Sequence, residues 1–264
     1  IRQQLGGRNA PSVWNAAFQS RLFWDGRAAS LEEQAVGPLL NPLEMGMPSP
    51  AAVVERVEND AEYPRLFRLA FTDDEPISMH RIAAAIASFE RSLITPDSAY
   101  DRFVRGDMDA LSPPARRGMA LFDAIGCTQC HSGPNFSAAG AQGNGLPIRA
   151  FPVTASALDP RLHLLDDKGL AASSSPTGVW RVPSLRNVAL TPPYFHNGSV
   201  KSLEEAVRIM ALTQLGLEVT EEANPPTVFW SASEQTLQLS GRRTLSKREL
   251  SDITSFLRAL SGEA

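Results

Sequence analysis

The two cysteines of this 264-residue chain lie in one pentapeptide, Cys127-Thr-Gln-Cys130-His131. Cys-x-x-Cys-His is the attachment sequence of a c-type haem. In such a site the two thiols add to the vinyl groups of the porphyrin, and the adjacent histidine binds the iron. The sequence therefore predicts one covalent haem c on Cys127, Cys130 and His131.

Three other interpretations of the pentapeptide remain open but fit less well. A structural zinc ion would need four ligands, and the other histidines, His80, His163 and His196, are scattered along the chain. A thioredoxin-like dithiol would follow a buried strand, whereas a helix is predicted before Cys127. A simple disulfide would leave His131 unexplained.

Covalent haem also predicts where the protein works. The attachment machinery of bacteria acts outside the cytoplasm, so we expect a periplasmic protein. The cysteines give no independent evidence on the redox compartment, because the haem uses both.

The composition excludes two classes of partner. The net charge is −4 and no block of like charge is present, so a basic patch for nucleic acid is not expected. The longest apolar run, residues 82–87, is far too short to span a membrane. The length suits one large domain or two small ones.

Capping residues and helical periodicity predict a mainly α fold, with helices separated by long loops rich in Pro, Gly and Ser. A domain boundary is placed near Thr95, and residues 132–183 are predicted to be mostly loop, packed on a cofactor or a functional site. We find no internal repeat and no run of alternating strand residues. The predicted helices run from Ser30 through Val36, from Pro50 to Asn59, over Met79–Leu93, from Ser112 toward Cys127, onward from Ser202, and from Ser246 with Leu250, Ile253, Phe256, Leu257 and Leu260 inward and Gly262 as the stop.

Two long stretches resemble the bacterial di-haem cytochrome c peroxidases. They are "APSVWNAAFQSRLFWDGRAASLEEQAVGPLLNPLEM" and "VPSLRNVALTPPYFHNGSVKSLEEAVRIM", and the resemblance runs from about Arg8 to Gly262. It implies two cytochrome c-like helical domains, each with one haem. Residues 1–95 would form the peroxidatic-haem domain and residues 96–264 the electron-transfer domain, with the last helix a candidate to pack back on the first domain.

The resemblance assigns the pentapeptide to the electron-transfer haem and Met210 to the second iron ligand. A thioether is a soft, neutral donor that raises the reduction potential. A related di-haem enzyme, which matures a tryptophan-derived quinone, has tyrosine at this position, so Met210 favours the peroxidase branch. The alternative is that Met210 is only a core residue, since it follows Val207 at helical spacing.

On the peroxidatic side, Gln34 and Glu44 match residues over the open face of the first haem. A carboxylate there would act as general base and then acid on peroxide, while Gln34 would hold peroxide or water. Trp24 matches the tryptophan between the haems. The alternatives are a solvated loop residue for Glu44 and a buried aromatic anchor for Trp24.

The resemblance also implies a calcium site and a role for one histidine. Asn9, Thr191 and Pro193 match the calcium site between the domains, where oxygen donors suit that ion. These positions hold no carboxylate, so we expect modest affinity. His196 is interpreted as a buried hydrogen-bonding residue near the second haem, not as an iron ligand.

One part of the family pattern is missing. The first Cys-x-x-Cys-His should lie just before residue 1, and the histidine that closes the resting peroxidatic haem would align near Ile1, where none is found. We expect a preceding segment to carry that haem, because Trp24, Gln34 and Glu44 have no evident purpose without it.

The expected function is reduction of hydrogen peroxide to water, with electrons from a small cytochrome c or cupredoxin, by a homodimer that contains calcium. The alternatives are a monohaem electron-transfer cytochrome, if the first haem is truly absent, and a di-haem oxidase of a protein substrate.

Overall fold

The computed structural model describes residues 4–73, 75–154, 158–222, 227–231, 236–240 and 244–262. Helices are its main elements. The α-helices are α1 (Leu31–Leu40), α2 (Pro50–Glu58), α3 (Tyr63–Ala70), α4 (Met79–Ser92), α5 (Ala99–Val104), α6 (Pro113–Ala124), α7 (Leu203–Leu215) and α8 (Lys247–Arg258), and the short 3-10 helices are η1 (Ala16–Phe18), η2 (Cys127–Gln129), η4 (Pro160–Leu162) and η5 (Val188–Leu190).

The strands form three two-stranded sheets. β1 (Ile148–Phe151) pairs antiparallel with β2 (Gly178–Arg181), with Ile148 opposite Arg181. β3 (Glu218–Thr220) runs parallel to β6 (Thr244–Ser246), and β4 (Thr227–Ser231) pairs antiparallel with β5 (Thr236–Ser240). The segment 132–183, predicted as loop, therefore contains the β1–β2 sheet, and α3 and α5 are further elements that the sequence pattern did not predict.

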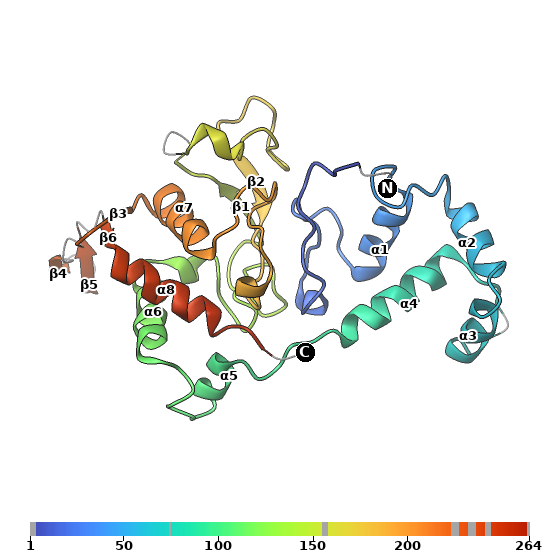
Figure 1. The fold of residues 1–264 in the computed structure, drawn as a ribbon, viewed down its shortest axis with the longest axis horizontal. Helices are drawn as coiled ribbons and strands as arrows, with labels where there is room; N and C mark the ends of the chain where they lie inside the picture. Colours follow the sequence, from blue (N-terminus) through green and yellow to red (C-terminus); the bar gives the residue numbers. More distant parts are fainter. Residues whose placement is uncertain are drawn as a thin grey trace.

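Figure 1 shows α1–α4 on one side of the molecule and α5–α8 with the strands on the other. The chain between α4 and α5 joins the two groups, and the carboxy-terminal end lies beside that connection. None of the described helices is both long enough and apolar enough to cross a membrane.

Serine caps begin nearly all of the described α-helices, as their local sequence predicts. The Ser30 hydroxyl accepts from the Glu33 amide, and Ser246 does the same for Glu249. The reciprocal bond of a capping box forms at Ser246 but not at Ser30, because the Glu33 carboxylate accepts from the Ala29 amide instead.

The last helix packs within the carboxy-terminal group. α8 lies against α6 and α7, so its main contacts are not with the amino-terminal helices. Gly118 of α6 allows the close approach, since a Cβ there would lie 1.9 Å from the Asp252 carbonyl oxygen. Phe122 and Phe256 meet edge to face with ring centroids 5.4 Å apart. All five residues predicted to face inward on α8 are buried.

The structure contains an internal repeat that the sequence analysis missed. Asn15 and Asn187 both have left-handed backbone and cap the 3-10 helices η1 and η5. At the same spacing along the chain, the bridge Leu22–Ala28 corresponds to the bridge Tyr194–Val200. α1 then corresponds to α7, each beginning with Ser-Leu-Glu-Glu.

The repeat extends to the helix that closes each half. α4 ends in Ile-Ala-Ser-Phe-Glu-Arg-Ser-Leu93 and α8 in Ile-Thr-Ser-Phe-Leu-Arg-Ala-Leu260, identical at five of eight positions. The Asn15 amide donates to the Leu93 carbonyl at 2.9 Å, and the Asn187 amide donates to the Leu260 carbonyl at 3.3 Å. The two halves therefore share contacts as well as sequence.

The repeat differs at one conspicuous aromatic residue. Phe256 is 1% exposed because α6 covers it, whereas its counterpart Phe89 on α4 is 66% exposed. Among the described residues, no helix packs on α4 in the way that α6 packs on α8.

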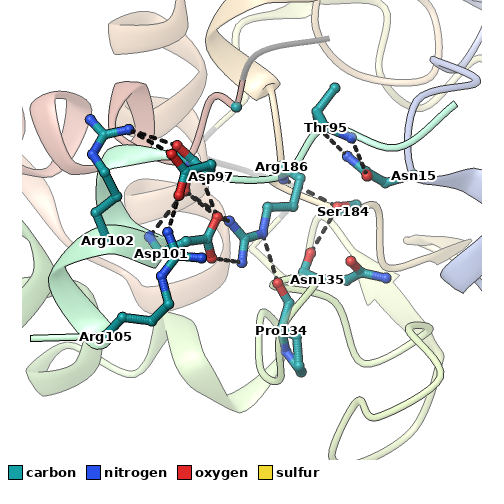
Figure 2. A network of polar contacts seen from close by, with 12 residues as sticks. Asn15, Thr95, Asp97, Asp101, Arg102, Arg105, Pro134, Asn135, Ser184 and Arg186 are labelled. Atoms are coloured by element: carbon teal, nitrogen blue, oxygen red, sulfur yellow. Dashed lines mark hydrogen bonds and ion pairs between the residues drawn. The ribbon is translucent and has the colours of Figure 1, made fainter.

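A polar network joins the two groups of helices at the α4–α5 connection (Figure 2). Thr95 accepts from the side-chain amides of Asn15 and Asn187, each at 2.7 Å. Arg186 donates two hydrogen bonds to Asp101, at 2.9 and 2.8 Å. The connection is thus held by partners from both halves of the chain.

Candidate functional site

One cavity of about 1090 Å³ contains every residue that the sequence analysis assigned to a site. It extends from the carboxy-terminal helices to the loops around α1. The predicted residues in its lining are Asn9, Trp24, Gln34, Glu44, Cys127, Cys130, His131, Thr191, Pro193 and Met210.

The pentapeptide lies at the end of α6. Gly126, with φ of 95°, turns the chain from α6 into η2, which begins at Cys127. Both cysteines are free thiols, so the disulfide alternative is not what the structure contains. Burial raises the pKa of the Cys127 thiol to about 12, so it is a neutral thiol facing an apolar site.

His131 is oriented to bind a metal through one defined nitrogen. Its Nδ1 lies 3.0 Å from the carbonyl oxygen of Phe136, an acceptor, so Nδ1 carries the proton. Nε2 is then the unprotonated nitrogen, the arrangement that iron-binding histidines use. Burial lowers the pKa of His131, which favours the neutral, metal-binding form.

Met210 lies on α7 beside the apolar core of the carboxy-terminal half. It packs against the buried cluster that includes Phe122, Ile253 and Leu257. Each of these four residues also lines the cavity. Met210 is therefore both a core neighbour, as the alternative interpretation held, and a side chain that faces the same space as His131.

Two arginines on the cavity wall, Arg149 and Arg181, could pair with the propionate carboxylates of a haem. Arg181 is 6% exposed and has no carboxylate partner among the described residues, and burial lowers its pKa to about 10. The Nε atom of Arg149 is buried without a hydrogen-bond partner. A buried cation calls for a compensating anion, and the propionate groups of a haem supply two. The thiols, the histidine and these cations together fit a haem c.

On the other side of the cavity, Gln34 is half-buried on α1, and Glu44 follows that helix and is exposed. The carboxylate of Glu44 accepts from the Asn41 amide at 2.8 Å. Both line the cavity, so a small molecule between them could reach either side chain.

Trp24 belongs to a stack of rings between the two groups of helices. It meets His196 edge to face with ring centroids 6.4 Å apart, and His196 stacks on Trp180 at 4.0 Å. The repeat places Trp24 and His196 at equivalent positions. The Trp24 indole donates to the Asn9 carbonyl at 2.8 Å.

His196 is buried, as predicted, with 1% exposure. Its Nε2 has no hydrogen-bond partner among the described residues, which differs from the predicted hydrogen-bonding role. Burial lowers its pKa to about 4, so the imidazole is neutral at neutral pH.

The predicted calcium residues are partly brought together. The Asn9 side-chain amide donates to the Pro193 carbonyl at 2.8 Å, and Thr191 lines the same cavity. The described residues contain no group of three or more His, Cys, Asp or Glu side chains that could hold a metal ion. An ion here would rely on amide and carbonyl oxygens.

Comparison with known proteins matches this arrangement to a family. The model of the di-haem cytochrome c peroxidase family matches residues 1–109. The cytochrome c551 peroxidase of Nitrosomonas europaea is 35% identical over 98% of this chain and 67% of its own length. The chain belongs to the di-haem cytochrome c peroxidase family.

The family includes proteins of a second type. The methylamine utilization protein MauG of Methylophilus methylotrophus is 33% identical over 97% of this chain and 69% of its own length. The crystal structure of a MauG-like protein associated with microbial copper homeostasis has 30% identity and a TM-score of 0.74, over 98% of this chain and 76% of that one. The chain thus spans about two thirds of the length of these curated relatives.

Sequence reasoning missed four residues of this peroxidase-family site: Arg149, Arg181, Trp180 and Glu90. No motif marks the first three. Glu90 could have been found from the sequence, because it stands in the repeated helix ending at the position where the second copy has the apolar Leu257.

Proposed function

We propose that the complete protein reduces hydrogen peroxide to water in the periplasm, with electrons from a small cytochrome c or cupredoxin. The observation that supports this most is the single cavity, which unites the haem-binding pentapeptide with Gln34 and Glu44. A bound haem would supply the iron that binds peroxide and accepts single electrons.

Residues of this chain would transfer the protons of the reaction. Reduction of hydrogen peroxide takes two electrons and two protons and yields two waters. The Glu44 carboxylate would accept the proton of one peroxide oxygen and return it to the other, so that water leaves. Gln34 would hold peroxide by hydrogen bonds from its amide.

The carboxy-terminal half would store and pass electrons. Nε2 of His131 and the sulfur of Met210 would both hold the iron of its haem, which would then serve to pass electrons rather than to bind peroxide. The soft thioether would keep the potential high enough for a small redox protein to reduce this haem.

We propose that a segment outside residues 1–264 supplies the haem of the amino-terminal half. Phe89 supports this, because its counterpart Phe256 is covered by α6, the helix that precedes the pentapeptide. An equivalent helix before a first Cys-x-x-Cys-His would cover Phe89. Residues 1–95 and 96–264 would then be two cytochrome c-like domains.

Calcium and dimerisation complete the proposal. Asn9, Thr191 and Pro193 would bind calcium between the two halves, where a Ca²⁺ titration of calcium-free protein would detect it. A homodimer is proposed from family resemblance, and sedimentation equilibrium would test it.

A second candidate is a di-haem oxidase of a protein substrate. The similarity to MauG supports it, and the methionine at position 210, rather than tyrosine, argues against it. The third, a monohaem carrier, would hold if the full-length gene product contained a single haem.

The deciding experiment combines haem stoichiometry with turnover in the full-length protein. Two haems per chain and peroxide consumption driven by reduced cytochrome c are expected. Two haems with no turnover by any small donor would favour the oxidase, and one haem would favour the carrier.

A further inference from the structure

Glu90 is a half-buried residue on the cavity wall whose carboxyl group no role assigned above uses. It lies in the last turns of α4 and lines the cavity together with Gln34 and Glu44. Its Oε2 atom is buried and has no hydrogen-bond partner among the described residues. A carboxylate oxygen in such a place is stabilised by a proton or by a partner that the described residues do not provide.

The repeat shows what occupies the same position in the other half. Glu90 corresponds to Leu257 of α8, which is 4% exposed and lines the cavity on the side of His131 and Met210. The equivalence rests on contacts as well as sequence. Thr95 donates its amide to the Asn15 side chain at 3.1 Å, and Gly262 donates to the Asn187 side chain at 3.0 Å, so both helices end in the same setting.

An apolar residue at this position faces the haem site of the carboxy-terminal half. The amino-terminal half therefore has an ionisable group where its electron-transfer counterpart has only hydrocarbon. Other differences between the repeats fall on the same wall, since Gln34 corresponds to Ala206. At both of these positions the polar residue belongs to the half in which proton chemistry is proposed.

The charged neighbours of Glu90 leave it uncompensated. Arg91, next to it on α4, pairs with Glu32 of α1 at 2.7 Å. η1 carries no charged residue, and the charged residues of α2, Glu55, Arg56 and Glu58, are exposed. Burial is the main cause that raises the pKa of Glu90; the charge of Arg91 lowers this pKa, and the charge of Glu32 offsets part of that effect.

We propose that Glu90 is the proton-exchanging group of the amino-terminal half and takes up one proton when that half takes up one electron. The proposal rests on the proposed function, which places a haem in this half. A one-electron reductant supplies the electron, and solvent supplies the proton to a carboxylate oxygen of Glu90, so the buried charge stays constant. Glu90 acts through charge and does not touch peroxide, so it is a positioning residue rather than a catalytic one.

The physical reason is the cost of unbalanced charge in a space of low dielectric. Adding an electron near a buried carboxylate raises its proton affinity, since two negative charges repel strongly there. Between the pKa of Glu90 in the oxidised and in the reduced protein, each electron therefore brings a proton. Leu257 cannot do this, so the carboxy-terminal haem should lack the coupling.

Redox titration of the full-length two-haem protein between pH 5 and pH 9 tests the proposal without turnover. In the wild type, the potential of the amino-terminal haem should fall as pH rises, while that of the Met210 haem stays level. In Glu90→Gln the amino-terminal potential should become independent of pH. The matched control is Glu58→Gln, which removes an exposed carboxylate from the neighbouring helix α2 and should leave the wild-type slope unchanged.

Glu90→Leu provides a second variant, because the repeat shows that leucine fits this place. It should also abolish the slope. Two results would overturn the role of Glu90: a wild-type amino-terminal potential that does not depend on pH, or a dependence that persists in both variants. Neither result would count against the proposed reduction of peroxide. Normal slopes with no turnover would count against the proposed function alone, and a single haem per chain would remove both.

Discussion

At the level of single residues, the two sides of the cavity differ in the chemistry of their side chains. Met210 and His131 offer two metal donors, whereas Glu44 and Glu90 offer carboxyl groups that can exchange protons and Gln34 offers an amide that can donate hydrogen bonds. This division predicts that electron entry and peroxide cleavage can be impaired separately.

Met210→His should lower the potential of the carboxy-terminal haem, because an imidazole stabilises ferric iron better than a thioether does. The haem should remain attached through Cys127 and Cys130. Turnover with a small donor should fall while haem content is unchanged. A redox titration checks this, and an unchanged potential would show that Met210 is only a core residue.

Glu44→Gln should leave both potentials in place and slow peroxide cleavage by about 10²–10⁴-fold, the usual contribution of a general acid–base group. The amide keeps the shape of the side chain but cannot carry the proton. Stopped-flow mixing of the reduced protein with peroxide measures this step. Asn41→Ala is the control and should have a smaller effect, because it removes the side chain that hydrogen-bonds to Glu44 and to the Leu43 amide but keeps the carboxylate.

At the level of elements, the crossing of α6 and α8 fixes where the pentapeptide begins. α6 delivers Cys127 to the cavity, and its distance from α8 depends on the bare backbone at Gly118. The ion pair of Arg117 with Asp252, at 2.7 Å, spans the same crossing.

Gly118→Ala should therefore destabilise the protein by about 1–3 kcal/mol, the range for an overpacked core. The added methyl group would meet the Asp252 backbone, which cannot move without shifting α8. Gly7→Ala is the control, since a Cβ there has nothing within 4 Å. Urea unfolding of the haem-loaded protein compares the two, and equal midpoints would contradict the close crossing.

At the level of the whole molecule, Arg8 joins the two halves of the chain. It donates to Asp25 of the amino-terminal half at 2.6 Å and to Asp167 of the carboxy-terminal half at 2.6 Å. Its guanidinium also lies over the Trp180 ring, 5.1 Å from the centroid. The aromatic stack between the halves is thus held from one side by a single cation.

Arg8→Gln should lower the free energy of unfolding by about 1.5–3 kcal/mol at neutral pH, as expected for hydrogen bonds to charged groups. Burial alone would raise the pKa of Asp25, but hydrogen bonds from Arg8 and Arg27 outweigh it and hold the pKa low. The stabilisation is therefore present above the ordinary Asp pKa and is lost as pH falls through the lowered one.

The variant should accordingly show a flatter loss of stability below about pH 4, the ordinary range of Asp. Urea unfolding at several pH values measures this. Arg27→Gln, which removes a half-exposed partner of Asp25 from the same half, should have the smaller effect of about 0–1 kcal/mol. Equal effects of the two variants on the free energy of unfolding would mean that the Arg8 link between the halves contributes no extra stability.

Local features of the sequence predicted much of the helical structure and the haem attachment. Serine caps act on amides three residues away, so α1, α2, α6, α7 and α8 begin where their caps predict, and α4 begins at Met79, where the apolar spacing predicts. The pentapeptide is likewise contiguous, and its chemistry can be recognised without a fold. The inward-facing residues of the last helix were predicted correctly because α6 and α7 cover the face on which its apolar residues lie.

The same reasoning failed where burial depends on distant partners. Phe89 has the spacing of a core residue yet is exposed, because no described helix packs on its side of α4. The repeat escaped detection because few residues are identical, although their backbone conformations and hydrogen bonds agree. The expected return of the last helix to the first domain was wrong for a similar reason, since the contact at Gly118 is invisible in sequence.

The sequence by itself thus determined which atoms can bind a haem, since thiols and an imidazole at fixed spacing need no tertiary contact to be recognised. Only the tertiary structure decided that Glu44, Glu90 and Met210 line one cavity. It also decided that, among the described residues, Arg181 is buried without a carboxylate partner and the Oε2 atom of Glu90 is buried without a hydrogen-bond partner. Burial and lack of a partner are properties of surroundings, which are assembled from segments far apart in the chain. That is why the charge balance of the site could be inferred only after folding.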